Sequence, residues 1–87
     1  MGVGFKPVAA MNFHHTVHSQ ARQRQRSITQ AQVEDAVLTG QRKMLTSQRG
    51  EHGRILRKHW KHIDGRKLLV IAETKGENCY VMTEYYE

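Results

Sequence analysis

The strongest structural signal in this chain is the dipeptide Asp64-Gly65, followed closely by the continuous apolar run Leu68-Leu69-Val70-Ile71. Both central residues of a type I′ turn need a positive φ, and Asp-Gly meets that need, so the dipeptide predicts a tight β-hairpin. An apolar run without alternation is typical of a strand that is buried on both faces. We therefore expect strands at residues 54–63 and 67–73, with the second strand at the centre of a sheet.

Other turn and strand signals flank this hairpin. The turn residues Lys75-Gly76-Glu77-Asn78 precede residues 79–86, which are rich in aromatic and β-branched side chains and predict a last strand. Residues 42–46 are a candidate short strand, and a polar loop through Gly50 and Gly53 follows it. Together these segments predict an antiparallel sheet of three to four strands.

A first helix is expected before the sheet. Residues 14–26 contain neither Gly nor Pro and are rich in Gln, Arg and Ala. Phe13, Val17 and Ala21 recur every four positions, which predicts that this helix carries a thin apolar stripe.

A second helix is expected directly after the first. Thr29 and Gln32 have the spacing of a capping box, which marks a helix start. Gly40 stands where the C′ residue of such a helix would be. Its buried face would hold the apolar residues Ile28, Val33, Ala36 and Val37. The predicted fold class is therefore α+β, with two N-terminal helices packed on a three- to four-stranded antiparallel sheet.

The length of 87 residues suits one domain and is too short for two. Residues 1–12 hold two glycines, the only proline and no periodicity, so we expect a leader or linker there and a single domain over 13–87. No apolar run approaches the roughly 20 residues of a membrane-spanning helix, and no signal peptide is recognisable. We expect no membrane insertion.

The metal-binding residue types do not form a recognisable motif. The single cysteine, Cys79, can neither close an internal disulfide nor supply a cysteine-based zinc site. His14 and His18 have the four-residue spacing of helical zinc ligands, but they lack the Glu of an H-E-x-x-H motif and a clear third ligand. We therefore expect neither a metal nor a cofactor.

Charge is distributed unevenly along the chain, whose formal net charge is +6. Residues 1–67 hold 13 basic and 4 acidic side chains (+9), and residues 68–87 hold 1 basic and 4 acidic (−3). All six histidines lie in the first part. This surplus favours a polyanionic partner, nucleic acid first, and the alternative is a solvated surface without a partner.

Three titratable or cationic residues lie at four-residue intervals in the first predicted helix. His18, Arg22 and Arg26 would therefore descend one helix face over about two turns. From the spacing alone, an ordinary solvated face and an anion-binding row remain open.

Residues 18–29, with this row followed by Ile28-Thr29, resemble the opening motif of a family of small bacterial domains related to the RelE/ParE toxins. That family belongs to the wider barnase–EndoU–colicin–RelE (BECR) ribonuclease fold. The hairpin segment 63–70 and the closing segment 80–85 resemble the last two strands of the same family. The resemblance covers residues 14–87, nearly the whole predicted domain.

The resemblance implies a metal-independent ribonuclease toxin that cleaves RNA, with transfer RNA as one candidate substrate. Such a domain acts in the cytoplasm, either as a cytosolic protein or as a part of a larger secreted toxin, and an acidic immunity protein or antitoxin restrains it. The catalytic residues that match the family motif are His18, Arg22, Arg26, Thr83 and Tyr85. The alternative is a non-catalytic module of the same shape that grips nucleic acid or protein.

The chemistry of metal-free RNA cleavage is compatible with these residue types. The reaction needs a base, an acid and cations that stabilise the developing charge on phosphorus. We assign proton transfer to His18, phosphate contacts to Arg22 and Arg26, and a hydrogen bond to the phosphate to Thr83 or Tyr85.

The predicted strand 54–63 supplies further candidates for RNA contacts. Alternation places Arg57, His59 and Lys61 on one of its faces and Lys58, Trp60 and His62 on the other, and the sequence leaves open which face meets RNA. For the same reason Trp60 is either a base-stacking or a packing residue. The RNA-binding candidates are Arg57, His59, Lys61, Arg66 and Lys67.

Overall fold

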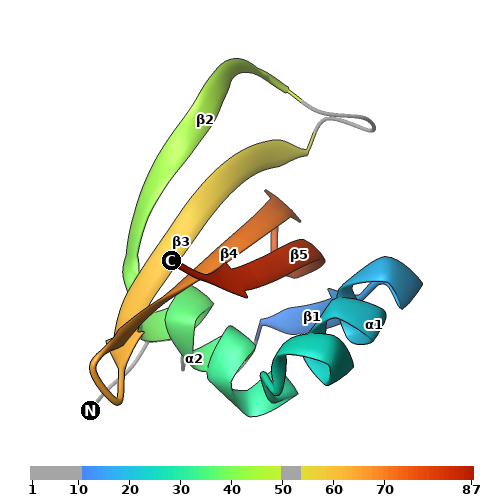
Figure 1. The fold of residues 1–87 in the computed structure, drawn as a ribbon. Coiled ribbons are helices and arrows are strands. Elements are labelled where there is room, and N and C mark those ends of the chain that lie inside the picture. Colours follow the sequence, from blue (N-terminus) through green and yellow to red (C-terminus); the bar gives the residue numbers. More distant parts are fainter. Residues whose placement is uncertain (1–10, 50–53) are drawn as a thin grey trace, which may run out of the picture.

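A computed structural model describes residues 11–49 and 54–87 as two helices and a five-stranded mixed sheet, which confirms the α+β class (Figure 1). The elements in chain order are β1 (Asn12–His15), α1 (Val17–Arg26), α2 (Gln30–Thr39), β2 (Gln41–Arg49), β3 (Ile55–Ile63), β4 (Arg66–Lys75) and β5 (Asn78–Tyr86). The strand order is β1-β5-β4-β3-β2, so the apolar strand β4 lies at the centre as expected.

The first strand corrects two sequence-based expectations. Residues 12–15 form β1, which pairs in parallel with β5 from Asn12↔Asn78 to His15↔Val81, so the sheet is mixed and larger than predicted. The first helix begins after Thr16, whose side chain accepts a hydrogen bond from the Ser19 amide at 3.0 Å, and not at His14. A strand of four residues is too short to show a period, and its partner is the last strand of the chain, so no local signal marks it.

The hairpin between β3 and β4 forms as predicted. Asp64 has a φ of 52° and Gly65 a φ of 78°, which is the positive pair that a type I′ turn requires. Cross-strand pairing runs from Ile63↔Arg66 to Ile55↔Thr74. This regular register fixes which side chains share a face along the whole length of the two strands.

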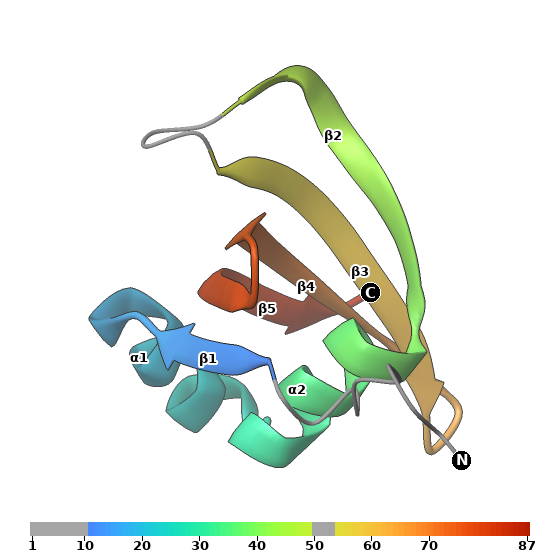
Figure 2. The ribbon, with the colours of Figure 1, turned by 180° about the vertical axis from the view of Figure 1, so that it is seen from behind.

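The hydrophobic core lies between α2 and one face of the sheet. Figure 2 shows the same arrangement as Figure 1 from behind, with both helices beneath the central strands. The predicted buried face of the second helix is confirmed, and it packs against alternate residues of β4 and β5. The core residues are Ile28, Val33, Ala36, Val37, Leu68, Val70, Ala72, Cys79 and Val81.

Helix α1 packs through polar residues, which contradicts the predicted apolar stripe. Val17 is 84% exposed, whereas Ser19 and Gln23 are buried against β5. The reason is that β5 presents the carboxylate of Glu84 to this helix, so hydrogen-bonding side chains fit the interface better than apolar ones.

Helix α2 has the predicted capping box, with Thr29 and Gln32 bonded reciprocally at 3.0 Å. Its end differs from the prediction, because Gly40 has an extended backbone (φ −82°) and not the left-handed one of a C′ glycine. Glycine is required there for space. A Cβ atom would lie 2.4 Å from the carbonyl oxygens of both Ala36 and Trp60.

A bulge in β5 sets the two faces of that strand. Ile71 pairs with Thr83 and Ala72 pairs with Val81, so Met82 is an extra residue. Val81 and Glu84 therefore both face the helices. Thr83 and Tyr85 lie on the opposite, helix-free face.

Candidate functional site

A pocket of about 410 Å³ lies where the end of α1 meets the start of β4 and the end of β5, and it is lined by Arg26, Arg66, Tyr85 and Tyr86. The Arg26 guanidinium donates a 2.6 Å hydrogen bond to the carbonyl oxygen of Glu84 and lies 6.0 Å from the centre of the Tyr85 ring. The Arg66 guanidinium lies 4.0 Å from the centre of the Tyr86 ring. Two guanidinium groups and two phenols therefore surround one space, which suits a phosphate or carboxylate.

The row of His18, Arg22 and Arg26 is present on α1, but only Arg26 lines the pocket. His18 and Arg26 are eight positions apart on the helix, which corresponds to about 12 Å along its axis. Arg22 Nε donates a 3.4 Å hydrogen bond to His18 Nε2, and Arg22 also bonds Gln25 at 3.2 Å. The pair of His18 and Arg22 thus forms a separate exposed group on the same helix.

The candidates on the last strand separate in the same way. Tyr85 lines the pocket beside Arg26, whereas Thr83 does not. The structure therefore brings together Arg26, Tyr85 and the RNA-binding candidate Arg66, while His18, Arg22 and Thr83 lie outside the pocket.

Three predicted RNA-binding residues face the helices. Arg57 donates a 2.6 Å hydrogen bond to Thr74. Lys61 Nζ donates hydrogen bonds to Asp35 at 2.5 Å and to Thr39 at 2.8 Å. The pKa of Asp35 is lowered, mainly by the hydrogen bond from Lys61 and next by the one from Thr39. Arg57 and Lys61 thus engage in contacts within the domain.

His59 is the third of these residues, and it is only 2% exposed. Neither of its ring nitrogens has a hydrogen-bond partner among the described residues. Burial, with a further contribution from the charges of Arg57 and Arg42, lowers the pKa of His59 to about 4. A side chain in this position has no exposed surface to offer RNA.

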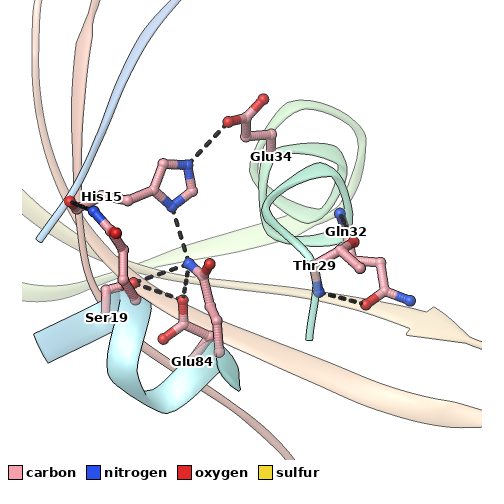
Figure 3. Close-up of polar contacts among 8 residues, drawn as sticks. His15, Ser19, Thr29, Gln32, Glu34 and Glu84 are labelled. Atoms are coloured by element: carbon pink, nitrogen blue, oxygen red, sulfur yellow. Dashed lines mark hydrogen bonds and ion pairs between the residues drawn. The ribbon is translucent and has the colours of Figure 1, made fainter. Parts of the chain in front are cut away.

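A buried polar network joins α1 to β5, and the sequence analysis missed it (Figure 3). Glu84 is fully buried, and its Oε1 accepts hydrogen bonds from Ser19 Oγ at 2.6 Å and Gln23 Nε2 at 2.7 Å. Its Oε2 is buried without a hydrogen-bond partner among the described residues. The network fixes the backbone to which Arg26 bonds, and so places Arg26 at the pocket.

The network continues to β1 and α2 through His15. The amide nitrogen of Gln23 lies 3.0 Å from His15 Nδ1, and His15 Nε2 lies 2.9 Å from the Glu34 carboxylate. An amide nitrogen can only donate, so Nδ1 accepts and the proton is on Nε2, which donates to Glu34. Alternation gave no signal for Glu84, because it lies three residues after the core residue Val81 and only the bulge at Met82 turns it toward the helices.

The remaining reactive residues do not form a second site. Cys79 is buried, and its burial, with a further contribution from Glu34, raises the pKa of the thiol to about 11. Within residues 11–49 and 54–87, no group of three or more His, Cys, Asp or Glu side chains is placed to hold a metal ion. In the same described ranges, no helix has the length and apolar character needed to cross a membrane.

Comparison of the chain with protein-family models, curated proteins and solved structures found no match.

Proposed function

We propose that this domain is a metal-independent ribonuclease toxin that binds the phosphodiester backbone of RNA at the pocket. The observation that supports this most directly is the convergence of Arg26 and Arg66, which come from a helix and a distant strand, on one space beside Tyr85. Two guanidinium groups can contact separate phosphate oxygens and stabilise the charge that develops there.

The proposed reaction is attack of a ribose 2′-oxygen on the adjacent phosphorus. The new P–O bond closes a 2′,3′-cyclic phosphate as the bond to the 5′-oxygen breaks. A base takes the 2′-hydroxyl proton and an acid supplies a proton to the leaving oxygen. We assign a hydrogen bond to the phosphate to Tyr85. His18, the sequence-based candidate for proton transfer, lies about 12 Å along α1 from Arg26, beyond hydrogen-bond reach of a phosphate at the pocket, so neither proton step is assigned to it.

A second candidate is a module that binds nucleic acid without cleaving it. It is favoured by one observation: the four pocket-lining residues are arginine and tyrosine, whose ordinary pKa values lie far from neutrality, and His18 is two helical turns away.

The test is incubation of labelled RNA with the purified domain in excess EDTA. We expect fragments that end in a 2′,3′-cyclic phosphate. Arg26→Gln and Arg66→Gln should each slow cleavage by roughly 100-fold, the typical loss for one oxyanion-stabilising donor. Arg24→Gln is the matched control because it removes the same charge from an exposed position on the same helix.

Each other outcome has a definite meaning. If the RNA stays intact but still binds in a way that depends on Arg26, the ribonuclease proposal is contradicted and the module that binds nucleic acid without cleaving it is supported. Cleavage that EDTA abolishes would contradict the metal-independent mechanism. Expression of the domain in bacterial cytoplasm should arrest growth, and coexpression of a cognate acidic partner should relieve the arrest; growth without any partner would contradict the toxin role.

A further inference from the structure

The face of the sheet opposite the helices carries a row of apolar and aromatic side chains. By register, Trp60 of β3 lies beside Leu69 of β4, and Leu69 lies beside Tyr85 of β5. Leu69 is only 1% exposed, so Trp60 and Tyr85 are the members of this row that a ligand can reach. The core between sheet and helices contains Leu68 and Val70 but not Leu69, so this row belongs to the other face. Both helices lie on the opposite side of the sheet in Figures 1 and 2.

Cations surround this row. Lys58 Nζ and Lys67 Nζ lie 5.5 and 5.6 Å from the centre of the Trp60 ring. Lys67 also pairs with the carboxylate of Glu87 at 3.1 Å, near the exposed end of the chain. Ion pairs of this exposed kind contribute little, so a phosphate can take the place of the carboxylate.

A second aromatic position lies further along β5 on the same face. The Arg54 guanidinium lies 3.6 Å from the centre of the Tyr80 ring, and His14 stacks on Tyr80 at 4.8 Å. Arg54 is also 3.7 Å from the Glu73 carboxylate. The face therefore combines aromatic rings with more cations than anions on its strands, which matches the chemistry of a nucleic-acid strand.

The row reaches the pocket through one shared residue. Tyr85 lines the pocket and ends the row of Trp60, Leu69 and Tyr85. A chain whose phosphate lies between Arg26 and Arg66 can therefore pass directly onto the helix-free face.

We propose that the helix-free face binds single-stranded RNA, with a base stacked on Trp60 and flanking phosphates beside Lys58 and Lys67. The proposal rests on the proposed function and names its substrate as single-stranded. Trp60 and Tyr85 are two strands apart, about 10 Å. Bases in a duplex are stacked at 3.4 Å and their faces are covered, so only unpaired, spread bases can use both rings.

The sequence supplies its own probe, because Trp60 is the only tryptophan. The experiment titrates the domain with a fully 2′-O-methylated 12-nucleotide strand, which lacks the attacking hydroxyl and cannot be cleaved by this route. We expect stacking to quench Trp60 fluorescence. A duplex of the same length should quench it less and bind more weakly.

Variants separate stacking from charge. Trp60→Leu should weaken binding by about tenfold or more, and Trp60→Phe should restore most of the affinity. Lys58→Gln with Lys67→Gln should also weaken binding, since two phosphate contacts are lost. Met44→Ala is the matched control for loss of a large exposed apolar side chain, because Met44 pairs with Arg57 on the other face of the sheet.

Three results would each overturn the single-stranded RNA site on the helix-free face. They are Trp60 fluorescence that does not change on binding, an affinity for the duplex equal to that for the single strand, and affinities of Trp60→Phe and Trp60→Leu that both equal that of the unaltered domain. Such a result leaves cleavage of ordinary RNA at the pocket unaffected. Conversely, Trp60-dependent binding without cleavage of ordinary RNA would support the single-stranded RNA site and contradict the proposed ribonuclease activity. Far-UV circular dichroism and thermal unfolding of each variant verify that the fold is retained.

Discussion

Two buried polar side chains flank Val70 on the helix-facing side of the sheet. His59 pairs with Val70 from β3, and Glu84 pairs with it from β5. Glu84 receives two hydrogen bonds from α1, whereas His59 has no hydrogen-bond partner among the described residues. Burial of a polar group costs free energy unless partners replace water, so the two residues affect stability in opposite ways.

At Glu84, loss of one donor should destabilise the fold. Ser19→Ala removes the 2.6 Å hydrogen bond and leaves a buried oxygen less well satisfied. We expect the free energy of unfolding to fall by about 1–3 kcal/mol. Urea denaturation measures this change. Gln25→Ala, at an exposed position on the same helix, should stay within about 0.5 kcal/mol of the unaltered protein, and an equal loss in both variants would contradict this role of Ser19.

At His59, stability should depend on pH. The pKa of His59 is about 4 in the folded protein, against 6.5 for an ordinary histidine, so the unfolded chain takes up this proton first as pH falls. The free energy of unfolding is therefore highest above about pH 6.5 and should decrease by roughly 3 kcal/mol as pH falls to about 4. Denaturation curves across that range measure the slope.

His59→Phe should remove this pH dependence, because the variant has no group to protonate at that position. The exposed His62→Gln is the control and should keep the slope. If His59→Phe keeps the full dependence of the unfolding free energy on pH, that dependence comes from another titratable group.

At the scale of elements, Gly40 joins α2 to β2 where the chain passes close to β3. Its missing side chain permits the approach of two carbonyl oxygens, from Ala36 and Trp60. The same contact aligns Gln41 with Trp60, the first pair in the register of β2 on β3. This position therefore couples the helix end to the sheet edge.

Gly40→Ala should consequently be destabilising although its φ is ordinary. A Cβ atom at 2.4 Å from two oxygens forces the backbone to shift, and overpacking of this kind costs about 1–3 kcal/mol. The measurement is the thermal unfolding midpoint. An alanine variant as stable as the unaltered protein would show that the α2–β2 junction can move freely.

Elements with local signals were predictable, and elements set by distant partners were not. The Asp64-Gly65 turn and the Thr29 capping box lie within a few residues of what they determine. Strand β1 depends on β5, and the buried face of α1 depends on Glu84. The candidate site divides likewise: Arg26 and Tyr85 were named from the sequence, but their meeting with Arg66 follows from the sheet order.

At the scale of the whole molecule, the two faces of the sheet differ in what covers them and in the side chains that they carry. One face carries the helices and the buried network, and the other carries aromatic and cationic side chains. Four cations would contact phosphate in the two proposals: Arg26, Arg66, Lys58 and Lys67.

Binding of single-stranded RNA should therefore depend strongly on salt. Four phosphate contacts correspond to a slope of about −2.8 in log affinity against log salt, or an affinity loss of about 50-fold from about 50 to about 200 mM. Fluorescence titration at several salt concentrations measures the slope. Lys58→Gln with Lys67→Gln should reduce its magnitude by about 1.4, and an unchanged slope would mean that these lysines do not contact phosphate.

The parallel pairing of β1 with β5 also determines when this chain can fold. Asn12 and Asn78 are register partners, so the earliest strand acquires its hydrogen bonds only after the latest one has been synthesised. Glu84 comes from that same strand, and without it Ser19 and Gln23 lack their acceptor. A growing polypeptide therefore reaches the native pocket only after β5 emerges, and folding of β1 and α1 onto the sheet is delayed until then.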